Sequence, residues 1–217
     1  MLTRRLFAFG ALAGAVSLSG CMSTATTSPL GYQPVPPLDP KGKEKFAVPR
    51  TDTNAIPVAY RRQRVRAPRG YQPGTIVVDT KSRFLYLIED DGTAIRYGIG
   101  VGREGMAWSG DATIKRKAKW PTWTPPAEMI ARQPETRKYA GGMPGGPLNP
   151  LGARALYLYE GNRDTLFRLH GTAEERSIGN AVSSGCIRLM NEDIVDLYER
   201  VPLGTKVVVL QGRSAEA

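Results

Sequence analysis

A series of short segments rich in Val, Ile and Tyr, separated by turn residues, occupies the chain from Gly74 onward. Short segments bounded by Gly, Pro, Asn or Asp are typical of β-strands rather than of helices. The first three form a predicted meander, with Asp91-Gly92 as a turn signal between the last two. About 140 residues suffice for one hydrophobic core, so we predict a single, mainly β domain. The expected strands cover residues 75–79, 83–89, 94–101, 111–120, 154–159, 165–169 and 205–210.

Helices are expected at only a few places. Residues 127–133 could form a short helix and residues 174–178 a single turn. A longer helix is predicted to start at Asn191 as N-cap and to end before Pro202. Two segments, 120–126 and 141–147, are too rich in Pro and Gly for regular structure. They either shape a substrate cleft or cover the edge of the core.

The first 20 residues have the pattern of an export signal. Arg4 and Arg5 precede an uncharged apolar run of 13 residues, 6–18, whereas a bilayer-spanning helix needs about 20. The two arginines fit a twin-arginine signal and equally an ordinary one. Residues 18–21 resemble a bacterial lipobox, so we expect Cys21 to be acylated and to anchor the mature protein in a membrane. The alternative is a soluble secreted protein that is cleaved nearby.

Residues 21–72 are predicted to be a lipidated N-terminus and a linker. The segment is rich in Ser, Thr and Pro without a sustained period, so it is expected to be a disordered tether. Residues 39–70 hold nine basic and three acidic residues of a chain whose formal charge is +10. A nucleic-acid enzyme would place its basic stripe on the folded body, so no nucleic-acid partner is predicted. The cluster 61–66 either contacts anionic lipid or wall polymer or is simply solvated.

One thiol and one imidazole remain as candidates for chemistry. The sequence has a single histidine, His170, and two cysteines; if Cys21 carries lipid, only Cys186 is free, and it forms no disulfide. A thiol with a pKa of about 8.5 needs a neighbouring base to become a nucleophile. A lone cysteine or histidine is often structural, but the two together predict a catalytic pair. One His and one Cys are too few to hold zinc, so no metal site is predicted.

The stretch from His170 to Arg188 also carries a family resemblance. His170-Gly171-Thr172 followed by Ser183-Ser184-Gly185-Cys186-Ile187-Arg188 resembles the signature of L,D-transpeptidases with a YkuD-type catalytic domain, over about residues 74–210. The resemblance implies a YkuD-like β-sandwich or mixed sheet with a few short helices, and we place the catalytic domain at 73–211 and a frayed tail at 212–217. Many relatives have a histidine where this chain has Ser184, so that residue's role cannot be transferred.

The resemblance and the residues together predict a mechanism. His170 would act as general acid and base, Cys186 as the nucleophile, and backbone amides near Gly185 as the oxyanion hole. The resemblance implies that the carbonyl of Gly171 orients His170. Arg188 either holds a substrate carboxylate or pairs with an acid such as Asp193. Ser183 either contacts substrate or braces the loop, and Ser184 is assigned with it to substrate binding.

The substrate follows from the resemblance alone: a peptidoglycan tetrapeptide stem that loses its terminal D-alanine and is transferred to an amine, without a cofactor. The acceptor is either another stem or a protein attached to the wall. Two alternatives remain: a cysteine peptidase or amidase that transfers stems to water, and a non-catalytic wall-binding lipoprotein. The expected location is the periplasmic face of a bacterial membrane, with the outer membrane favoured because Met22 follows Cys21 where an aspartate would indicate inner-membrane retention.

Overall fold

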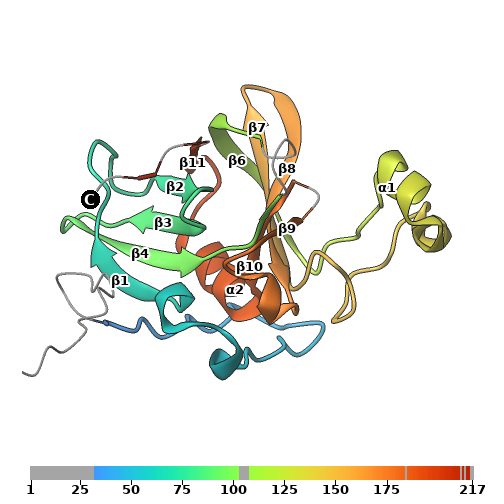
Figure 1. Cartoon of the computed structure of the whole chain (residues 1–217), viewed down its shortest axis with the longest axis horizontal. Coiled ribbons are helices and arrows are strands. Elements are labelled where there is room, and N and C mark those ends of the chain that lie inside the picture. The colour runs from blue at the N-terminus through green and yellow to red at the C-terminus, as the bar shows by residue number, and fades with distance from the viewer. Residues whose placement is uncertain (1–31, 103–107, 184, 211, 213, 216–217) are drawn as a thin grey trace, which may run out of the picture.

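A computed structural model describes residues 32–102, 108–183, 185–210, 212 and 214–215. Over these residues, nine strands form one mixed sheet in the order β1-β4-β3-β2-β11-β6-β7-β8-β10, and two short strands, β5 and β9, pair separately (Figure 1). Within the large sheet, β2 runs parallel to β11 and β8 parallel to β10, and the other neighbours are antiparallel. The strands are β1 (Gln63–Arg66), β2 (Ile76–Asp79), β3 (Phe84–Ile88), β4 (Thr93–Gly98), β5 (Val101–Gly102), β6 (Gly110–Lys119), β7 (Arg154–Glu160), β8 (Arg163–Thr172), β9 (Ala181–Ser183), β10 (Ile187–Met190) and β11 (Lys206–Leu210).

The central strand β2 explains why the sheet has apolar residues on both faces. Ile76 and Val78 belong to the main hydrophobic cluster, whereas Val77 belongs to a second cluster with Leu210. Successive side chains of a strand point to opposite faces, so an uninterrupted apolar run is what a strand covered on both sides requires. The predicted mainly β fold with a mixed sheet is confirmed.

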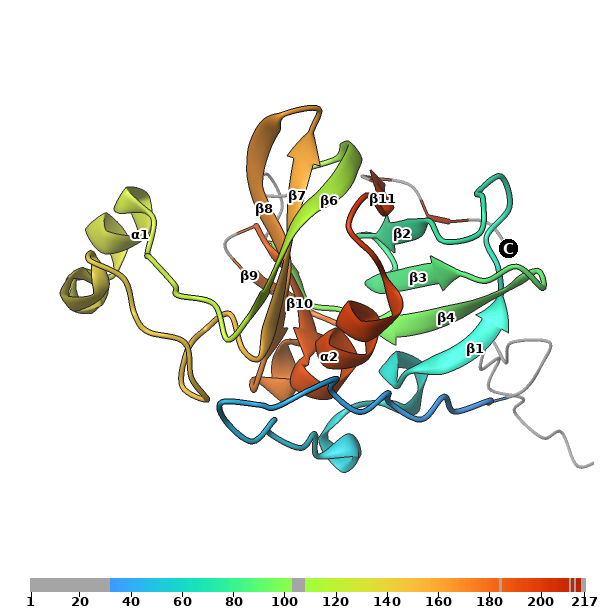
Figure 2. The same cartoon turned by 180° about the vertical axis from the view of Figure 1, so that it is seen from behind.

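Few helices accompany the sheet. The α-helices are α1 (Ala127–Arg132) and α2 (Asn191–Arg200), and the 3-10 helices are Thr53–Ala55, Val58–Tyr60, Pro134–Tyr139 and Glu175–Ser177. Helix α2 lies between strands β6, β7 and β8 on one side and β2, β3 and β4 on the other (Figure 2). Its Ile194 and Leu197 belong to the main hydrophobic cluster. Helix α1 stands out from the rest of the molecule (Figures 1 and 2). Within the described part of the chain, no helix combines the length and the hydrophobicity needed to cross a bilayer.

The prediction that Asn191 caps α2 was wrong. Met190 occupies the N-cap position, and its side chain makes no capping hydrogen bond. Asn191 is instead the first helical residue and is buried, and its Oδ1 accepts a hydrogen bond from the backbone N–H of Ala153 at 2.9 Å. The hydrogen bond to Ala153, 38 residues away in the sequence, therefore replaces the local capping bond that was predicted for this side chain.

The two loops rich in Pro and Gly are tied to each other. Trp123 and Met143 exchange backbone hydrogen bonds of 3.0 and 2.7 Å. The buried side-chain amide of Asn149 donates to the carbonyls of Pro121, Met143 and Pro144, each at 3.1 Å. One side chain thus hydrogen-bonds to backbone carbonyls of both loops and links them.

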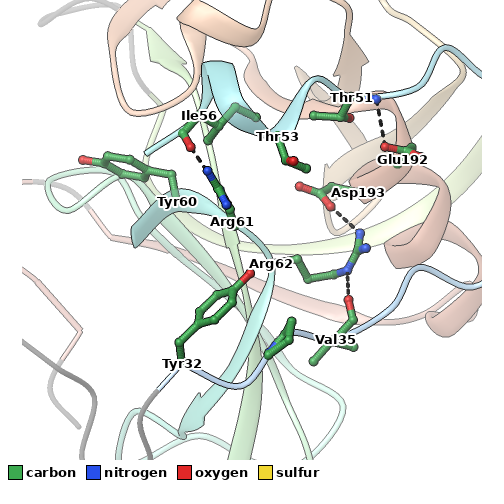
Figure 3. Close-up of a pocket in the computed structure, with 11 residues that line it drawn as sticks. Tyr32, Val35, Thr51, Thr53, Ile56, Tyr60, Arg61, Arg62, Glu192 and Asp193 are labelled. Carbon is green, nitrogen blue, oxygen red and sulfur yellow. Dashed lines mark hydrogen bonds and ion pairs between the residues drawn. The ribbon is translucent and has the colours of Figure 1, made fainter. Parts of the chain in front are cut away.

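Residues 32–66, which we call the N-terminal strap, differ from the expected disordered tether. Strand β1 within the strap pairs with β4. Acidic side chains of α2 bind three further points of the strap. The N–H of Leu38 donates to Asp196 at 2.8 Å. The N–H of Thr51 donates to Glu192 at 2.9 Å, and Arg62 pairs with Asp193 (Figure 3). Residues 22–31 and Cys21 lie outside the described residues.

A buried ion pair secures the middle of the strap. Arg154 is fully buried, and its Nη2 lies 2.5 Å from Oε1 of Glu44. The same carboxylate accepts a hydrogen bond of 2.8 Å from the indole of Trp120. A buried guanidinium requires a charged partner; Glu44 of the strap provides the close contact, and Glu199 of α2 lies 3.9 Å from Nη2. The composition of residues 21–72 could not predict this ion pair, because the partner of Glu44 lies 110 residues further along the chain.

Candidate active site

The parallel pair β8 and β10 places His170 beside the strand that follows Cys186. Leu169 is opposite Ile187, and His170 is opposite Arg188. Leu169 and Ile187 both belong to the buried core, so by alternation His170 and Arg188 project from the other face of the sheet, which we call the outer face.

Cys186 precedes β10 by one residue and Arg188 by two. If the strand geometry extends by that residue, the cysteine shares the outer face with His170. Strand spacings of about 4.8 Å across and 3.3 Å along the chain then give a Cα separation of roughly 8 Å between the two.

His170 is held in one tautomer. Its Nδ1 lies 2.8 Å from the carbonyl oxygen of Gly171, and because a carbonyl only accepts, Nδ1 carries the proton and donates it. Nε2 therefore keeps the lone pair that a general base needs. This is the contact that the family resemblance implies, while the catalytic role stays a prediction. Burial of the ring, with an additional contribution from the positive charge of Arg188, lowers the pKa of His170 from 6.5 to about 4, although the Gly171 carbonyl opposes the shift.

Close packing fixes the backbone that orients His170. A Cβ on Gly171 would lie 2.4 Å from Oδ1 of Asn191, and a Cβ on Gly152 would lie 2.3 Å from the same atom. Gly152 also has a positive φ of 61°. The N–H of Gly171 donates to the carbonyl of Leu151 at 3.1 Å. Both glycines are required because Asn191 occupies the space where any side chain would stand.

The thiol of Cys186 is partly buried and points along β8. Its Sγ lies 4.0 Å from the carbonyl oxygen of Leu166, to which it donates. Burial raises the pKa of Cys186, and the backbone N–H and the charge of Arg168 together with the charge of Arg188 only partly offset this effect. The resting site therefore contains a neutral thiol and a neutral imidazole. A neutral thiol becomes a nucleophile only when a base accepts its proton, and the role of His170 as that base stays a prediction.

Gly185 has a backbone conformation that favours glycine, with φ of 127°. A Cβ on Gly102 of β5 would lie 2.7 Å from the Cα of Gly185, so the two backbones are in direct contact. This approach sets the path of the chain into Cys186. Ser183 ends β9, but its side chain and the whole of Ser184 lie outside what the structure describes.

Arg188 has a different partner from the acid suggested by the sequence. Its Nη1 lies 2.7 Å from Oε2 of Glu174, whereas Asp193 pairs with Arg62 of the strap. The suggested Arg188–Asp193 pair was therefore wrong. Glu174 is 71% exposed at its side chain, so a substrate carboxylate could replace it at the guanidinium, and that role stays a prediction.

Sequence reasoning missed Arg168 and Glu174. Period-two alternation with His170 could have placed Arg168 on the outer face, whereas no local signal pairs Glu174 with Arg188. Among the residues with described positions, no group of three or more His, Cys, Asp or Glu side chains is arranged to hold a metal ion.

A pocket of about 230 Å³ lies elsewhere, between the strap and the start of α2 (Figure 3). It is lined by Tyr32, Pro34, Val35, Thr51, Thr53, Ile56, Tyr60, Arg61, Arg62, Glu192 and Asp193. Neither His170 nor Cys186 contributes to it.

Comparison with known proteins defines the class to which this fold and site belong. The sequence model of YkuD, described as the L,D-transpeptidase catalytic domain, matches residues 73–209. The chain therefore belongs to the YkuD family of L,D-transpeptidase catalytic domains, a family of transferase-type enzymes.

Individual relatives agree with this assignment. Over 150 residues the chain is 36% identical to the "Probable L,D-transpeptidase YbiS" of Escherichia coli (strain K12), covering 67% of this chain and 47% of that protein. Over 158 residues it is 35% identical to the "Probable L,D-transpeptidase ErfK/SrfK" of the same strain, covering 68% and 47%. The chain thus spans about half the length of these relatives.

A solved structure is also similar to the chain. It is a crystal structure described as a "Probable carnitine operon oxidoreductase caia" from Brucella melitensis, 52% identical, covering 73% of this chain and 99% of that one with a TM-score of 0.50. That protein is named for another activity, and the family assignment rests on the family model and the L,D-transpeptidase relatives.

Proposed function

We propose that this chain is a cysteine-dependent L,D-transpeptidase that acts on peptidoglycan stem peptides. Membership of the YkuD family and the names of its relatives support the activity class. One observation carries the proposal: β8 and β10 are paired so that the only histidine of the sequence lies one strand away from Cys186. The neutral state of both groups supports general-base activation of the thiol rather than a preformed ion pair.

The first half-reaction forms a thioester. Nε2 of His170 removes the proton from Sγ of Cys186 while sulfur attacks the amide carbonyl before the terminal D-alanine. The carbonyl electrons move to oxygen, where the backbone amides around Gly185 and Cys186 stabilise the charge. The C–N bond then breaks, the proton on Nε2 passes to the leaving nitrogen, and D-alanine departs with a free amine.

The second half-reaction transfers the acyl group. An acceptor amine gives a proton to the neutral Nε2 as its nitrogen attacks the thioester carbon. Collapse of the intermediate breaks the C–S bond, and the proton on Nε2 returns to sulfur. The product is a new amide and the thiol is restored. If water replaces the amine, the same steps give hydrolysis and a tripeptide stem.

The first experiment follows both half-reactions. Purified protein incubated with tetrapeptide stems should gain, by intact mass spectrometry, the mass of the stem less D-alanine, and the products should include crosslinked dimers. Cys186→Ala should show neither, and Cys186→Ser should give little adduct because its hydroxyl is a weaker nucleophile with a pKa far above 7. Tripeptide monomers without dimers would indicate hydrolysis. An unmodified wild-type protein would contradict the proposal.

We also propose that the protein is an exported lipoprotein on the periplasmic face of a bacterial membrane, anchored through Cys21. The apolar run at 6–18 and the small residues before Cys21 support this location. Fractionation of cells that express the full chain should find the wild type in the membrane fraction, and outer-membrane material is favoured. Cys21→Ser should be released to the soluble fraction or remain uncleaved, and an unchanged distribution would refute the anchor.

A further inference from the structure

A row of three side chains crosses the outer face beside the candidate active site. Tyr157 of β7 is opposite Arg116 of β6 on one side and Arg168 of β8 on the other. Both guanidinium carbons lie 4.3 Å from the centre of the tyrosine ring. Tyr157 is only 7% exposed, because the two arginines cover it.

The row shares the outer face with the catalytic residues. Leu156 and Leu158 are fully buried in the main cluster, so Tyr157 between them points the other way. Ala155, two residues before Tyr157, is opposite His170. Arg168, two residues before His170, must by the same alternation share its face. A register shift between Ile114 and Arg116 adds a residue to β6, which turns Arg116 to the outer face although Ile114 belongs to the core.

The charges on this face do not balance. Arg168 is engaged by Asp164 through two hydrogen bonds of 2.7 and 2.8 Å, and Arg188 is engaged by Glu174. Over the described residues, Arg116 has its ring contact with Tyr157 but takes no part in an ion pair. Burial opposes a fall in the pKa of Asp164, but the hydrogen bonds from Arg168 and from the N–H of Leu166 and the charge of Arg168 lower it, with a smaller contribution from the charge of Arg116. Among these described residues, three guanidiniums therefore face two carboxylates, and one more pair of anionic oxygens would balance the charge.

The position of the row indicates how far from the attacked carbonyl an anionic group of a bound substrate would lie. The guanidinium of Arg116 lies over the ring of Tyr157 in β7. Two strand spacings of about 4.8 Å separate β7 from β10, the strand that follows Cys186. The anion site is therefore roughly 10 Å from the sulfur. An extended peptide advances about 3.3–3.6 Å per residue, so the distance corresponds to two or three residue lengths from the attacked carbonyl.

We propose that Arg116, stacked on Tyr157 beside Arg168, forms a subsite for a free carboxylate of the donor stem peptide. The inference rests on the proposed function for the identity of the substrate. The ring holds the guanidinium in place, so little side-chain freedom is lost when the carboxylate binds. A planar guanidinium can bind a carboxylate by two parallel hydrogen bonds, which an ammonium cannot. The enzyme should therefore discriminate between stems whose upstream carboxylate is free and stems in which it is an amide.

The test compares two synthetic tetrapeptide stems that differ only in whether the upstream carboxylate, two or three residue lengths from the attacked carbonyl, is free or amidated. For wild type, kcat/KM of thioester formation should be up to about fivefold higher for the free acid, the upper end of the range expected of an exposed ion pair. Arg116→Gln should lose this preference through KM and act equally on both stems. Arg116→Lys should recover only part of it. High salt should reduce the preference in wild type.

Lys115→Gln is the matched control, because Lys115 is an exposed cation in the same strand that bonds to Asn162 instead. It should keep the full preference. Equal losses on both stems in Arg116→Gln, or no loss on either, would overturn the subsite.

A binding measurement separates the subsite from the catalytic proposal. Cys186→Ala cannot form a thioester, so calorimetric titration with the two stems reports recognition alone. Tighter binding of the free acid that disappears in Cys186→Ala combined with Arg116→Gln supports the subsite even if the wild type forms no thioester. Equal affinity for the two stems contradicts the subsite even if the wild type is a transpeptidase.

Discussion

The protonation of His170 offers a sharp test of the site, because it is the only histidine of the sequence. Burial lowers its pKa from 6.5 to about 4, and His170 is 4% exposed. The perturbation is a change of pH, and the matched variant is His170→Gln, which removes the titrating ring. Any difference in pH dependence between the two proteins then belongs to one group.

The sign and size of the expected change in unfolding free energy follow from the difference in the pKa of His170 between the folded and unfolded states. A histidine whose pKa falls on folding stabilises the folded state above its unfolded pKa, and the contribution is lost as pH falls from about 6.5 towards 4. With these pKa values, the free energy of unfolding should drop by about 2 kcal/mol more in wild type than in His170→Gln between about pH 7 and pH 4.5. Carboxylates that titrate in the same range contribute equally to both proteins and cancel in the comparison.

Two measurements check this result. Urea denaturation at the two pH values gives the difference in unfolding free energy. Nitrogen NMR of the imidazole gives its pKa directly and should find the proton on Nδ1, which donates to Gly171. A ring that is charged at neutral pH would refute the neutral pair and favour an imidazolium beside a thiolate. A pH dependence that is the same in both proteins would refute the lowered pKa of His170.

Three further substitutions test the supports of the site. Gly102→Ala places a Cβ 2.7 Å from the Cα of Gly185, so acylation of the thiol should slow by about tenfold or more while Gly141→Ala, which meets no atom within 4 Å, leaves the rate unchanged. Asn191→Ala leaves a buried N–H without its acceptor and should cost about 1–3 kcal/mol in urea denaturation. Glu44→Ala removes the main partner of buried Arg154 and should cost about 3 kcal/mol in the same assay, whereas Glu44→Gln, which keeps a hydrogen bond, should cost less.

Local signals were sufficient for most of the sheet. The apolar runs predicted β2, β3, β6, β7 and β11 to within one or two residues of their bounds, because each combines β-branched residues with turn residues at its ends. Strands β1, β9 and β10 were not predicted, and β1 shows the reason. Its sequence, Gln-Arg-Val-Arg, has one apolar residue, and what makes it a strand is pairing with β4.

The candidate site was predictable in its residues but not in its electrostatics. His170 and Cys186 were predicted because the sequence has few groups able to do nucleophilic chemistry, and their catalytic roles stay a prediction. The partner of Arg188 was not found, because Glu174 and Asp193 are both acids within 14 residues of it in the sequence and only the folded backbone distinguishes them.

The sequence by itself determined most of the long strands, the spacing of His170 and Cys186, and the family to which both point, since these depend on residue type and short-range order. Tertiary structure alone decided that the imidazole and thiol are neutral, that the strap lies against α2, and that Arg116 and Arg168 enclose Tyr157. The physical reason is that burial and cross-strand register are set by residues far apart in the chain, and these set the pKa values and the charge partners.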